Sequence, residues 1–195
     1  IEYLTAMGSN LYFVARSSSS DEQLWTTDGT GEGTVLVKEI NPSGNDKVNN
    51  IITNGTHLFF AANGTNGIEP WISDGTESGT QMIKDLNLGA GNSMPQIFIA
   101  NGTIVYFIAT NSTVGTELWR TDGTEAGTYL VKDINAGSSV PDYLVLYKDI
   151  LYFQAYNLTY GYELWKSDGT EAGTELVKDI YSGNSSSKPT ELTLF

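Results

Sequence analysis

The stretch "ELWRTDGTEAGTYLVKDI" at residues 117–134 returns almost unchanged as "ELWKSDGTEAGTELVKDI" at 163–180. Two looser copies precede them: "QLWTTDGTGEGTVLVKEI" at 23–40 and "EPWISDGTESGTQMIKDL" at 69–86. A catalytic motif normally occurs once, because one site needs one set of groups, whereas a phrase used four times is typical of a structural unit. The sequence therefore predicts a repeat fold.

Two series of aromatic residues give the period of the repeat. The tryptophans are 46, 48 and 46 residues apart, and a pair of aromatic residues keeps the same register: Tyr12-Phe13, Phe59-Phe60, Tyr106-Phe107 and Tyr152-Phe153. We place the repeats of a single domain, 1–195, at approximately 1–48, 49–95, 96–141 and 142–189. Residues 190–195 then form the first strand of a further repeat.

Each repeat contains four strand signals separated by Gly-, Asn- and Ser-rich turns. In the third repeat we expect strands at 96–100, 104–109, 117–121 and 129–134. Neighbouring residues of a strand point to opposite faces, so Leu118 and Trp119 place large apolar groups on both sides, and each sheet must be covered twice. We predict an all-β β-propeller of four four-stranded blades. The sequence leaves open whether the blades close as four, form half of a larger ring or continue as an open stack.

The repeated phrase has a structural explanation at each position. Its aspartates can accept hydrogen bonds from the turn backbone, the glycines after them can adopt positive φ, and the tryptophans fill the space between blades. These structural positions are Asp28, Asp74, Asp122 and Asp168; Gly29, Gly75, Gly123 and Gly169; and Trp25, Trp71, Trp119 and Trp165.

The phrase resembles the ELWxxDGT repeats of secreted, propeller-like proteins. The resemblance rests on Glu117-Leu118-Trp119 with Asp122-Gly123-Thr124, and on the matching residues at 163–170. The earlier repeats depart from it, with Gln23 for Glu and Pro70 for Leu. The turns are also similar to the Asp-box hairpins of sialidase propellers. The resemblance implies an extracellular, surface-associated location and no known catalysis.

The distribution of acidic residues argues against an enzyme. Fourteen of the 23 acidic residues stand at equivalent repeat positions, whereas a glycosidase pair needs two carboxylates in distinct environments. The one histidine, His57, has no Ser/His/Asp arrangement around it, and the chain has no cysteine. A formal net charge of −13 disfavours nucleic-acid partners, and no apolar run is long enough to span a membrane. We predict no catalytic residues.

Six N-x-[ST] sequons are present, at Asn54, Asn63, Asn101, Asn111, Asn157 and Asn184. Asn63, Asn111 and Asn157 fall in the same loop of successive repeats, which is compatible with glycosylation of an external protein. Asn54 and Asn101 lie in NGT hairpins, where Asn-Gly already favours a tight turn.

Two inter-blade loops share the pattern D-x-N-x-G, through Asp85 and Asn87 and through Asp133 and Asn135. Alternating oxygen donors before a glycine turn can bind Ca²⁺, although Asn/Gly turns explain the pattern equally well. We expect no other cofactor.

The first-strand pattern occurs five times for four repeats, the outer copies being 2–6 and 191–195. Because the sequence begins at Ile1, we interpret the chain as a processed or excerpted product. A surplus apolar strand can pair with another chain, so we expect head-to-tail strand addition between copies through 1–6 or 190–195.

Our functional prediction is a glycosylated, self-associating filament, matrix or surface-layer subunit located outside the cell. The alternative is a lectin-like adhesion propeller with Tyr156, Tyr160 and Tyr162 at a glycan site.

Overall fold

The computed structural model describes residues 2–17 and 21–193, which contain strands and turns but no helix. The strands form four antiparallel sheets, each of four strands consecutive in sequence. The sheets are β1 (Glu2–Met7), β2 (Asn10–Arg16), β3 (Glu22–Thr27) and β4 (Val35–Leu36); β5 (Asn49–Thr53), β6 (Leu58–Gly64), β7 (Gly67–Ser73) and β8 (Gln81–Met82); β9 (Gln96–Asn101), β10 (Ile104–Asn111), β11 (Gly115–Thr121) and β12 (Tyr129–Lys132); and β13 (Asp142–Tyr147), β14 (Ile150–Asn157), β15 (Gly161–Ser167) and β16 (Glu175–Lys178). The predicted four-stranded blades are confirmed.

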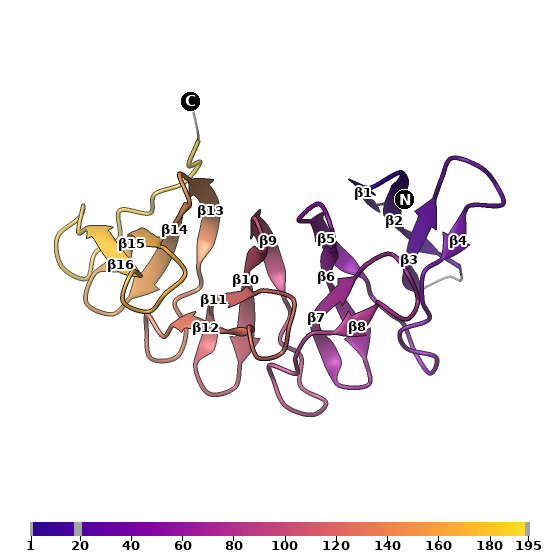
Figure 1. Ribbon diagram of the computed structural model, residues 1–195. Coiled ribbons are helices and arrows are strands. Elements are labelled where there is room, and N and C mark those ends of the chain that lie inside the picture. Colours follow the sequence, from indigo (N-terminus) through magenta and orange to yellow (C-terminus); the bar gives the residue numbers. More distant parts are fainter. Residues whose placement is uncertain (1, 18–20, 194–195) are drawn as a thin grey trace.

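The four blades are arranged as a fan (Figure 1). The first strands of successive blades, β1, β5, β9 and β13, contact one another along the inner side of the fan, and the fourth strands are spread along its outer side. The first and fourth blades stand at opposite ends of the fan, which remains open between them (Figure 1). Within the described residues, no blade is stacked on the outer face of the first blade or of the fourth, and we call these the two end faces.

The pairing of the two middle strands aligns the two aromatic series seen in the sequence. The phenylalanine of each second strand lies opposite the tryptophan of the third strand: Phe13 opposite Trp25, Phe60 opposite Trp71, Phe107 opposite Trp119 and Phe153 opposite Trp165. Cross-strand pairs of this kind stabilise a sheet on the face they share. The constant pairing gives every blade the same register.

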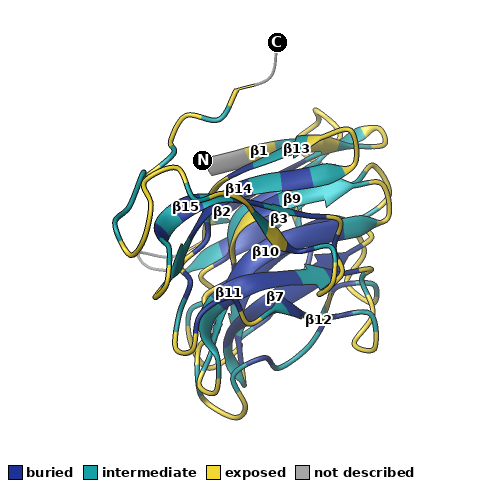
Figure 2. Ribbon diagram, turned by 90° about the vertical axis from the view of Figure 1, so that its left-hand side faces the viewer, coloured by how far each residue is buried: buried dark blue, intermediate teal, exposed yellow. Residues whose placement is uncertain are grey.

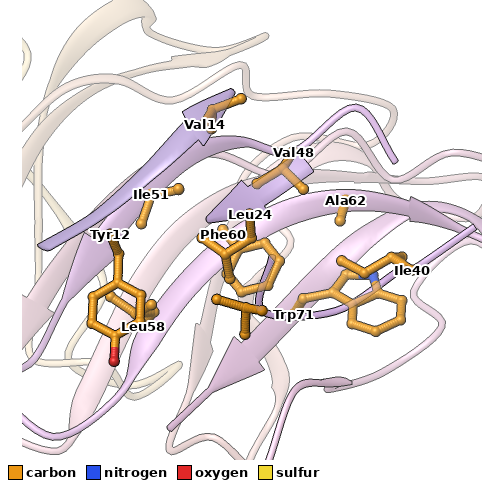
Figure 3. Close-up of a cluster of buried hydrophobic side chains, with 11 residues drawn as sticks. Tyr12, Val14, Leu24, Ile40, Val48, Ile51, Leu58, Phe60, Ala62 and Trp71 are labelled. Carbon is orange, nitrogen blue, oxygen red and sulfur yellow. The ribbon is translucent and has the colours of Figure 1, made fainter. Parts of the chain in front are cut away.

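The hydrophobic core lies between blades rather than within them. Its three clusters each combine residues from two consecutive blades. In the first cluster, Tyr12, Val14, Leu24 and Ile40 of the first blade meet Leu58, Phe60, Ala62 and Trp71 of the second (Figure 3). The buried residues accordingly concentrate in the middle strands of the fan (Figure 2). A blade buries its faces only against its neighbours.

The inner strands begin with a β-bulge, because their register with the second strands shifts by one residue near the start. In the last three blades this entry carries two non-glycine residues with positive φ, at Lys47 and Asn50, Met94 and Ile97, and Val140 and Tyr143. Lys188 and Glu191 repeat this backbone conformation, with φ values of 48° and 52°.

The segment 190–193 forms no strand and pairs with no strand of the described residues. The further repeat expected to begin at 190 stays a prediction. Residues 194 and 195, and also Ile1 of the segment 1–6, lie outside the described residues.

The DGT turns depend on one carboxylate oxygen in each blade. Oδ1 of Asp122 accepts hydrogen bonds from the backbone N–H and the hydroxyl of Thr124, at 2.9 and 2.7 Å. The Thr124 hydroxyl in turn accepts from the N–H of Gly127 at 2.9 Å, which places Gly127 against the carboxylate. The same arrangement occurs at Asp28, Asp74 and Asp168. The hydrogen bonds from threonine lower the pKa of all four aspartates.

Two glycines per turn are needed for different reasons. Gly123 has a φ of 93°, which residues with a Cβ tolerate poorly. Gly127 has no unusual φ, but a Cβ there would overlap the carboxylate of Asp122. The first glycine role was predicted from the sequence, whereas the second depends on a contact visible only in the fold.

The variant G127A should destabilise the protein by about 1–3 kcal/mol, because its methyl group displaces the Asp122 carboxylate from the turn. The matched control is G31A in the first blade, where a Cβ meets no atom within 4 Å and φ is not positive. Denaturant unfolding followed by tryptophan fluorescence measures both. Equal stability of the two variants would contradict this account of the turn.

Candidate functional site

Several polar contacts recur at the faces on which blades stack. One of these contacts is made by a lysine at the end of each repeat phrase. Nζ of Lys84 donates to the carbonyl oxygen of Thr128 in the next blade at 2.7 Å, with Glu125 O at 3.4 Å. Lys38 and Lys132 make the same pair of contacts one blade earlier and one blade later. Each lysine therefore fastens its blade to the DGT loop of the next.

An aromatic side chain makes a second contact on the same face. The ring of Tyr12 reaches Gly75 of the second blade, where an added Cβ would overlap the phenol oxygen. Tyr106 meets Gly169 in the same way, whereas at Gly123 a Cβ would meet Ile72 at 2.7 Å and Phe59 at 3.9 Å. The turn glycine of one blade thus accommodates the aromatic residue of the preceding blade.

The asparagines of the three loop sequons connect each blade to the blade before it. Nδ2 of Asn63, Asn111 and Asn157 donates to a carbonyl oxygen of the preceding blade, at 2.8, 2.5 and 2.7 Å. These amides are half-buried and bridge two blades. Sequence reasoning assigned them to glycan attachment and missed this bridge. The available signal was the first repeat, where Arg16 stands at the same strand position.

A buried carboxylate organises the inter-blade loop of each of the last three blades. Glu117 is fully buried, and its carboxylate accepts from the backbone N–H of Ser139 at 2.7 Å and from the Ser139 hydroxyl at 2.5 Å. Glu69 holds Ser93, and Glu163 holds Ser187, through the same two donors. The glutamate of the ELW phrase is therefore a structural acceptor that shapes the loop leading to the next blade.

The first blade makes the same loop with the two chemical groups exchanged. Gln23 replaces the glutamate, and Asp46 stands where the other blades have serine. Asp46 now supplies the carboxylate, which accepts from the N–H groups of Ile40 and Asn41 at 3.1 and 2.7 Å. Gln23 donates from Nε2 to Glu39 at 2.8 Å. One carboxylate per loop is thereby kept, although its position changes.

The pKa values of these carboxylates differ with their surroundings. Burial raises the pKa of Glu69 and Asp46, and raises that of Glu117 to about 7. Burial alone would also raise the pKa of Glu163, but the hydrogen bonds from Ser187 and the Ile180 N–H outweigh it, and its pKa lies below the ordinary value. Glu163 belongs to the fourth blade, whose outer face no blade of the described residues covers.

The two end faces carry the same residues as the internal faces, but without a partner blade. In the fourth blade Val177 and Ile180 are 43% and 54% exposed, whereas the equivalent Val131 and Ile134 of the third blade are 2% and 5% exposed. At the other end, Leu11 and Trp25 are half-buried, whereas their equivalents in the later blades are buried. Trp71, Trp119 and Trp165 lie in the inter-blade clusters, whereas Trp25 lies in none of the three clusters and is half-buried on a face that no described blade covers.

The remaining predicted residues have local roles. Oδ2 of Asp85 accepts from the side chain of Asn66 and from the Gly89 N–H, while Oδ1 of Asn87 and Asn135 accepts from backbone N–H groups of the following blade. No group of three or more His, Asp or Glu residues in the described part of the chain is placed to hold a metal ion. Calcium binding stays a prediction.

The hairpin sequon at Asn54 forms an Asx turn, in which Oδ1 accepts from the N–H groups of Thr56 and His57 at 3.1 and 2.9 Å. Nδ1 of His57 lies 3.1 Å from the Thr56 hydroxyl. Asn101 is half-buried and Asn184 exposed. Tyr156 and Tyr162 form a tilted ring pair with centroids 5.1 Å apart, and Tyr160 packs against the cluster between the third and fourth blades.

Comparisons with known proteins support the fold alone. No family model matches the sequence, and no curated protein matches it. Among solved structures the chain is similar to puromycin hydrolase (S511A mutant), with a TM-score of 0.62, 11% identity, and 93% of this chain and 29% of that chain covered. It is similar to the acylaminoacyl peptidase of Pyrococcus horikoshii, with a TM-score of 0.60, 13% identity, and 91% and 27% covered.

A third similar structure is a putative TolB from Agrobacterium tumefaciens, with a TM-score of 0.53, 13% identity, and 90% and 63% covered. The chain therefore spans less than two thirds of the length of each of these proteins. The blades are those of a β-propeller.

None of the described residues belongs to a helix long and apolar enough to cross a membrane.

The protein should lose stability as the pH rises from about 5 to 8. The folded state holds a proton on Glu117 more tightly than the unfolded state, whose pKa is near 4.5, so this contribution is complete below pH 4.5 and lost as the pH passes about 7. The loss from Glu117 is at most about 3 kcal/mol.

Thermal unfolding at pH 5 and 8 in about 0.3 M salt, which screens the general repulsion of the acidic chain, measures this dependence. E117Q should show a smaller difference between the two pH values. An unfolding temperature that rises from pH 5 to 8 would contradict the assignment.

Exchanging the two groups in the third blade should reproduce the arrangement of the first. E117Q should cost about 2–3 kcal/mol, because the Ser139 donors lose a carboxylate acceptor. Adding S139D to E117Q should recover at least half of that loss, since the loop then carries its own carboxylate as at Asp46. S139D alone should destabilise, because it places two carboxylates together.

A double-mutant cycle from urea unfolding gives the coupling between the two positions. Losses that simply add would show that the exchange seen in the first blade is not a compensation.

Proposed function

We propose that this chain is a non-catalytic structural repeat protein that self-associates as a subunit of a filament, matrix or surface layer outside the cell. The observation that carries this proposal is the pair of uncovered end faces. Val177 and Ile180 of the fourth blade are exposed, although their equivalents form part of the core in every other blade. Apolar groups that a fold buries three times and leaves exposed once indicate a surface that another molecule covers.

The roles of the acidic residues support a non-catalytic function. The turn aspartates accept bonds from threonine, and the glutamates of the repeat phrase accept bonds from serine and loop N–H groups. The same two roles recur along the fan, so these carboxylates are accounted for as structural groups. The similarity to peptidases is at 11–13% identity and adds no catalytic residue to this chain.

Glycosylation and an extracellular location belong to the same proposal. Asn184 is exposed, and the amide of Asn54 uses its oxygen in the turn, so glycans can be attached at Nδ2 of both without removing a described hydrogen bond. At Asn63, Asn111 and Asn157 a glycan leaves one N–H on Nδ2, which is enough to keep the bond to the preceding blade. The resemblance to secreted ELWxxDGT repeats supports the location.

Strand addition between copies is the joint suggested by the surplus first-strand pattern. β1 is already paired with β2 of its own blade, so residues 2–7 are not a spare strand. The segment 190–193 has the backbone entry of an inner strand and no sheet partner among the described residues, which supports strand addition through this end of the predicted pattern.

A carbohydrate-binding module is the second candidate. A hollow of about 350 Å³ on the fourth blade is lined by Tyr143, Tyr162, Asp142, Gln154 and Lys188, among others. Aromatic rings with adjacent polar groups suit a sugar ligand. This hollow lies at an end face and includes one of the three tyrosines predicted for a glycan site.

The test of self-association is sedimentation velocity over a range of protein concentrations, combined with electron microscopy of the native material. The proposal predicts a sedimentation coefficient that increases with concentration, and elongated or ring-shaped particles built from four-blade units. A monomer at all concentrations, with saturable binding on a glycan array, would reject the structural role in favour of the lectin.

A further inference from the structure

The three stacking interfaces within the chain are built from the same parts, and the two end faces carry one half of these parts each. At each interface the blade that comes earlier in the sequence contributes an aromatic residue, two apolar residues and a lysine, and we call this its lysine face. The blade that comes later contributes apolar residues of its middle strands and its DGT loop, and we call this its loop face.

The fourth blade has an uncovered lysine face. It is formed by Tyr152, Val177, Lys178 and Ile180, at the positions of Tyr106, Val131, Lys132 and Ile134 in the third blade. The four residues of the third blade lie in its interface with the fourth blade. Three of them are buried, and Lys132 donates to the DGT loop of the fourth blade. In the fourth blade Val177, Lys178 and Ile180 are exposed and Tyr152 is half-buried.

The first blade has an uncovered loop face. Leu11, Phe13, Ala15 and Trp25 occupy the positions of Leu151, Phe153, Ala155 and Trp165, which form the fourth blade's half of the last interface. A mostly apolar hollow of about 300 Å³ lies at Leu11, Thr27, Asp28 and Gly29. It lies beside Gly29, at the position where the tyrosine of a preceding blade meets Gly75 and Gly169 in the later blades.

The polar groups at the two ends also correspond. The carbonyl oxygens of Gly31 and Thr34 stand at the positions of Glu77 and Thr80, which accept the bonds from Lys38. Lys178 stands at the position of the donor lysines. The loop face of the first blade therefore offers acceptors of the kind that Lys178 does not contact among residues 2–17 and 21–193.

We propose that the lysine face of one copy docks on the loop face of a second copy, in the register of consecutive blades. Val177 and Ile180 then cover Leu11, Phe13 and Trp25, the ring of Tyr152 enters the hollow at Gly29, and Lys178 Nζ donates to Thr34 O. This inference rests on the proposed self-association and identifies its partner and its joint. The contact is head-to-tail, so it generates either a closed ring or an open filament.

Two residues distinguish this joint from an internal one. Arg16, which is paired with Glu22, replaces the asparagine that bridges to the preceding blade, and Gln154 replaces an apolar residue and donates to Pro189 O at 2.8 Å. The docking of copies should therefore be weaker than the stacking of blades, and reversible on dilution. A net charge of −13 on each copy adds repulsion, so salt should strengthen the association.

The test uses two variants that block one face each. V177D/I180D places carboxylates on the lysine face, and L11E places one on the loop face. Each variant alone should sediment as a monomer at concentrations where the unmodified chain associates. A mixture of the two should form one-to-one dimers, because each still carries one intact face. L158E, which changes an exposed apolar residue in a loop of the fourth blade, is the matched surface control and should associate like the unmodified chain.

A pair of lysine variants provides a second measurement that does not depend on adding charge to an apolar face. K178A should weaken association by about tenfold and leave the unfolding temperature unchanged, since it removes a charge-assisted hydrogen bond only between copies. K132A should lower the unfolding temperature and leave association unchanged, because its partner Thr174 lies in the same chain.

The outcomes separate this joint from the broader proposal. An unmodified chain that stays monomeric rejects both. Association of the unmodified chain that persists in both blocked variants, or is unaffected by K178A, rejects this joint and leaves self-association through 190–195 standing. A mixture of blocked variants that stays monomeric rejects the head-to-tail register.

Discussion

The constraint on which this structure depends is that no blade can bury its own faces. Alternate residues of each middle strand point to opposite sides, and both sets are apolar: Leu118 lies in the cluster toward the fourth blade, and Trp119 in the cluster toward the second. A four-stranded sheet with two such faces buries both of them only when it lies between two others. Stability is therefore a property of interfaces between repeats, as in other repeat proteins.

The polar residues of the repeat serve the same interfaces. The lysine bonds the loop of the next blade, the asparagine bonds the loop of the preceding blade, and the buried glutamate shapes the loop between them. All three are charged or amide side chains, which would cost free energy if they were buried without hydrogen-bond partners. The same lysine and asparagine contacts recur at each of the three interfaces between described blades.

The sequence was sufficient to predict the blades because their signals are local. The tryptophan spacing gives the period, adjacent apolar residues such as Leu118 and Trp119 require two covered faces, and D-G-T predicts a turn. The partner of the buried glutamate could not be predicted, because Ser139 is 22 residues away and lies after the D-x-N-x-G part of its loop. The joint replacement of glutamate by Gln23 and of serine by Asp46 was the signal of that contact within the sequence itself.

The two end faces could not be predicted either, because exposure depends on which blades are present rather than on residue type. Val131 and Val177 occur in nearly identical phrases, and only their place in the fan makes one buried and the other exposed. The sequence did indicate a surplus first strand, but the segment 190–193 pairs with no strand of the described residues. Sequence patterns thus describe one blade well, and its neighbours decide the rest.

The most direct test of the central claim, that one kind of interface acts both within and between chains, is hydrogen–deuterium exchange at several protein concentrations. The account predicts that amides of 176–180 and of the DGT loop at 28–34 exchange faster in dilute solution and become more protected together as the concentration rises. Amides of 130–134, which are covered in every copy, should be protected throughout. Exchange at 176–180 that does not change with concentration in an associating sample would contradict the claim.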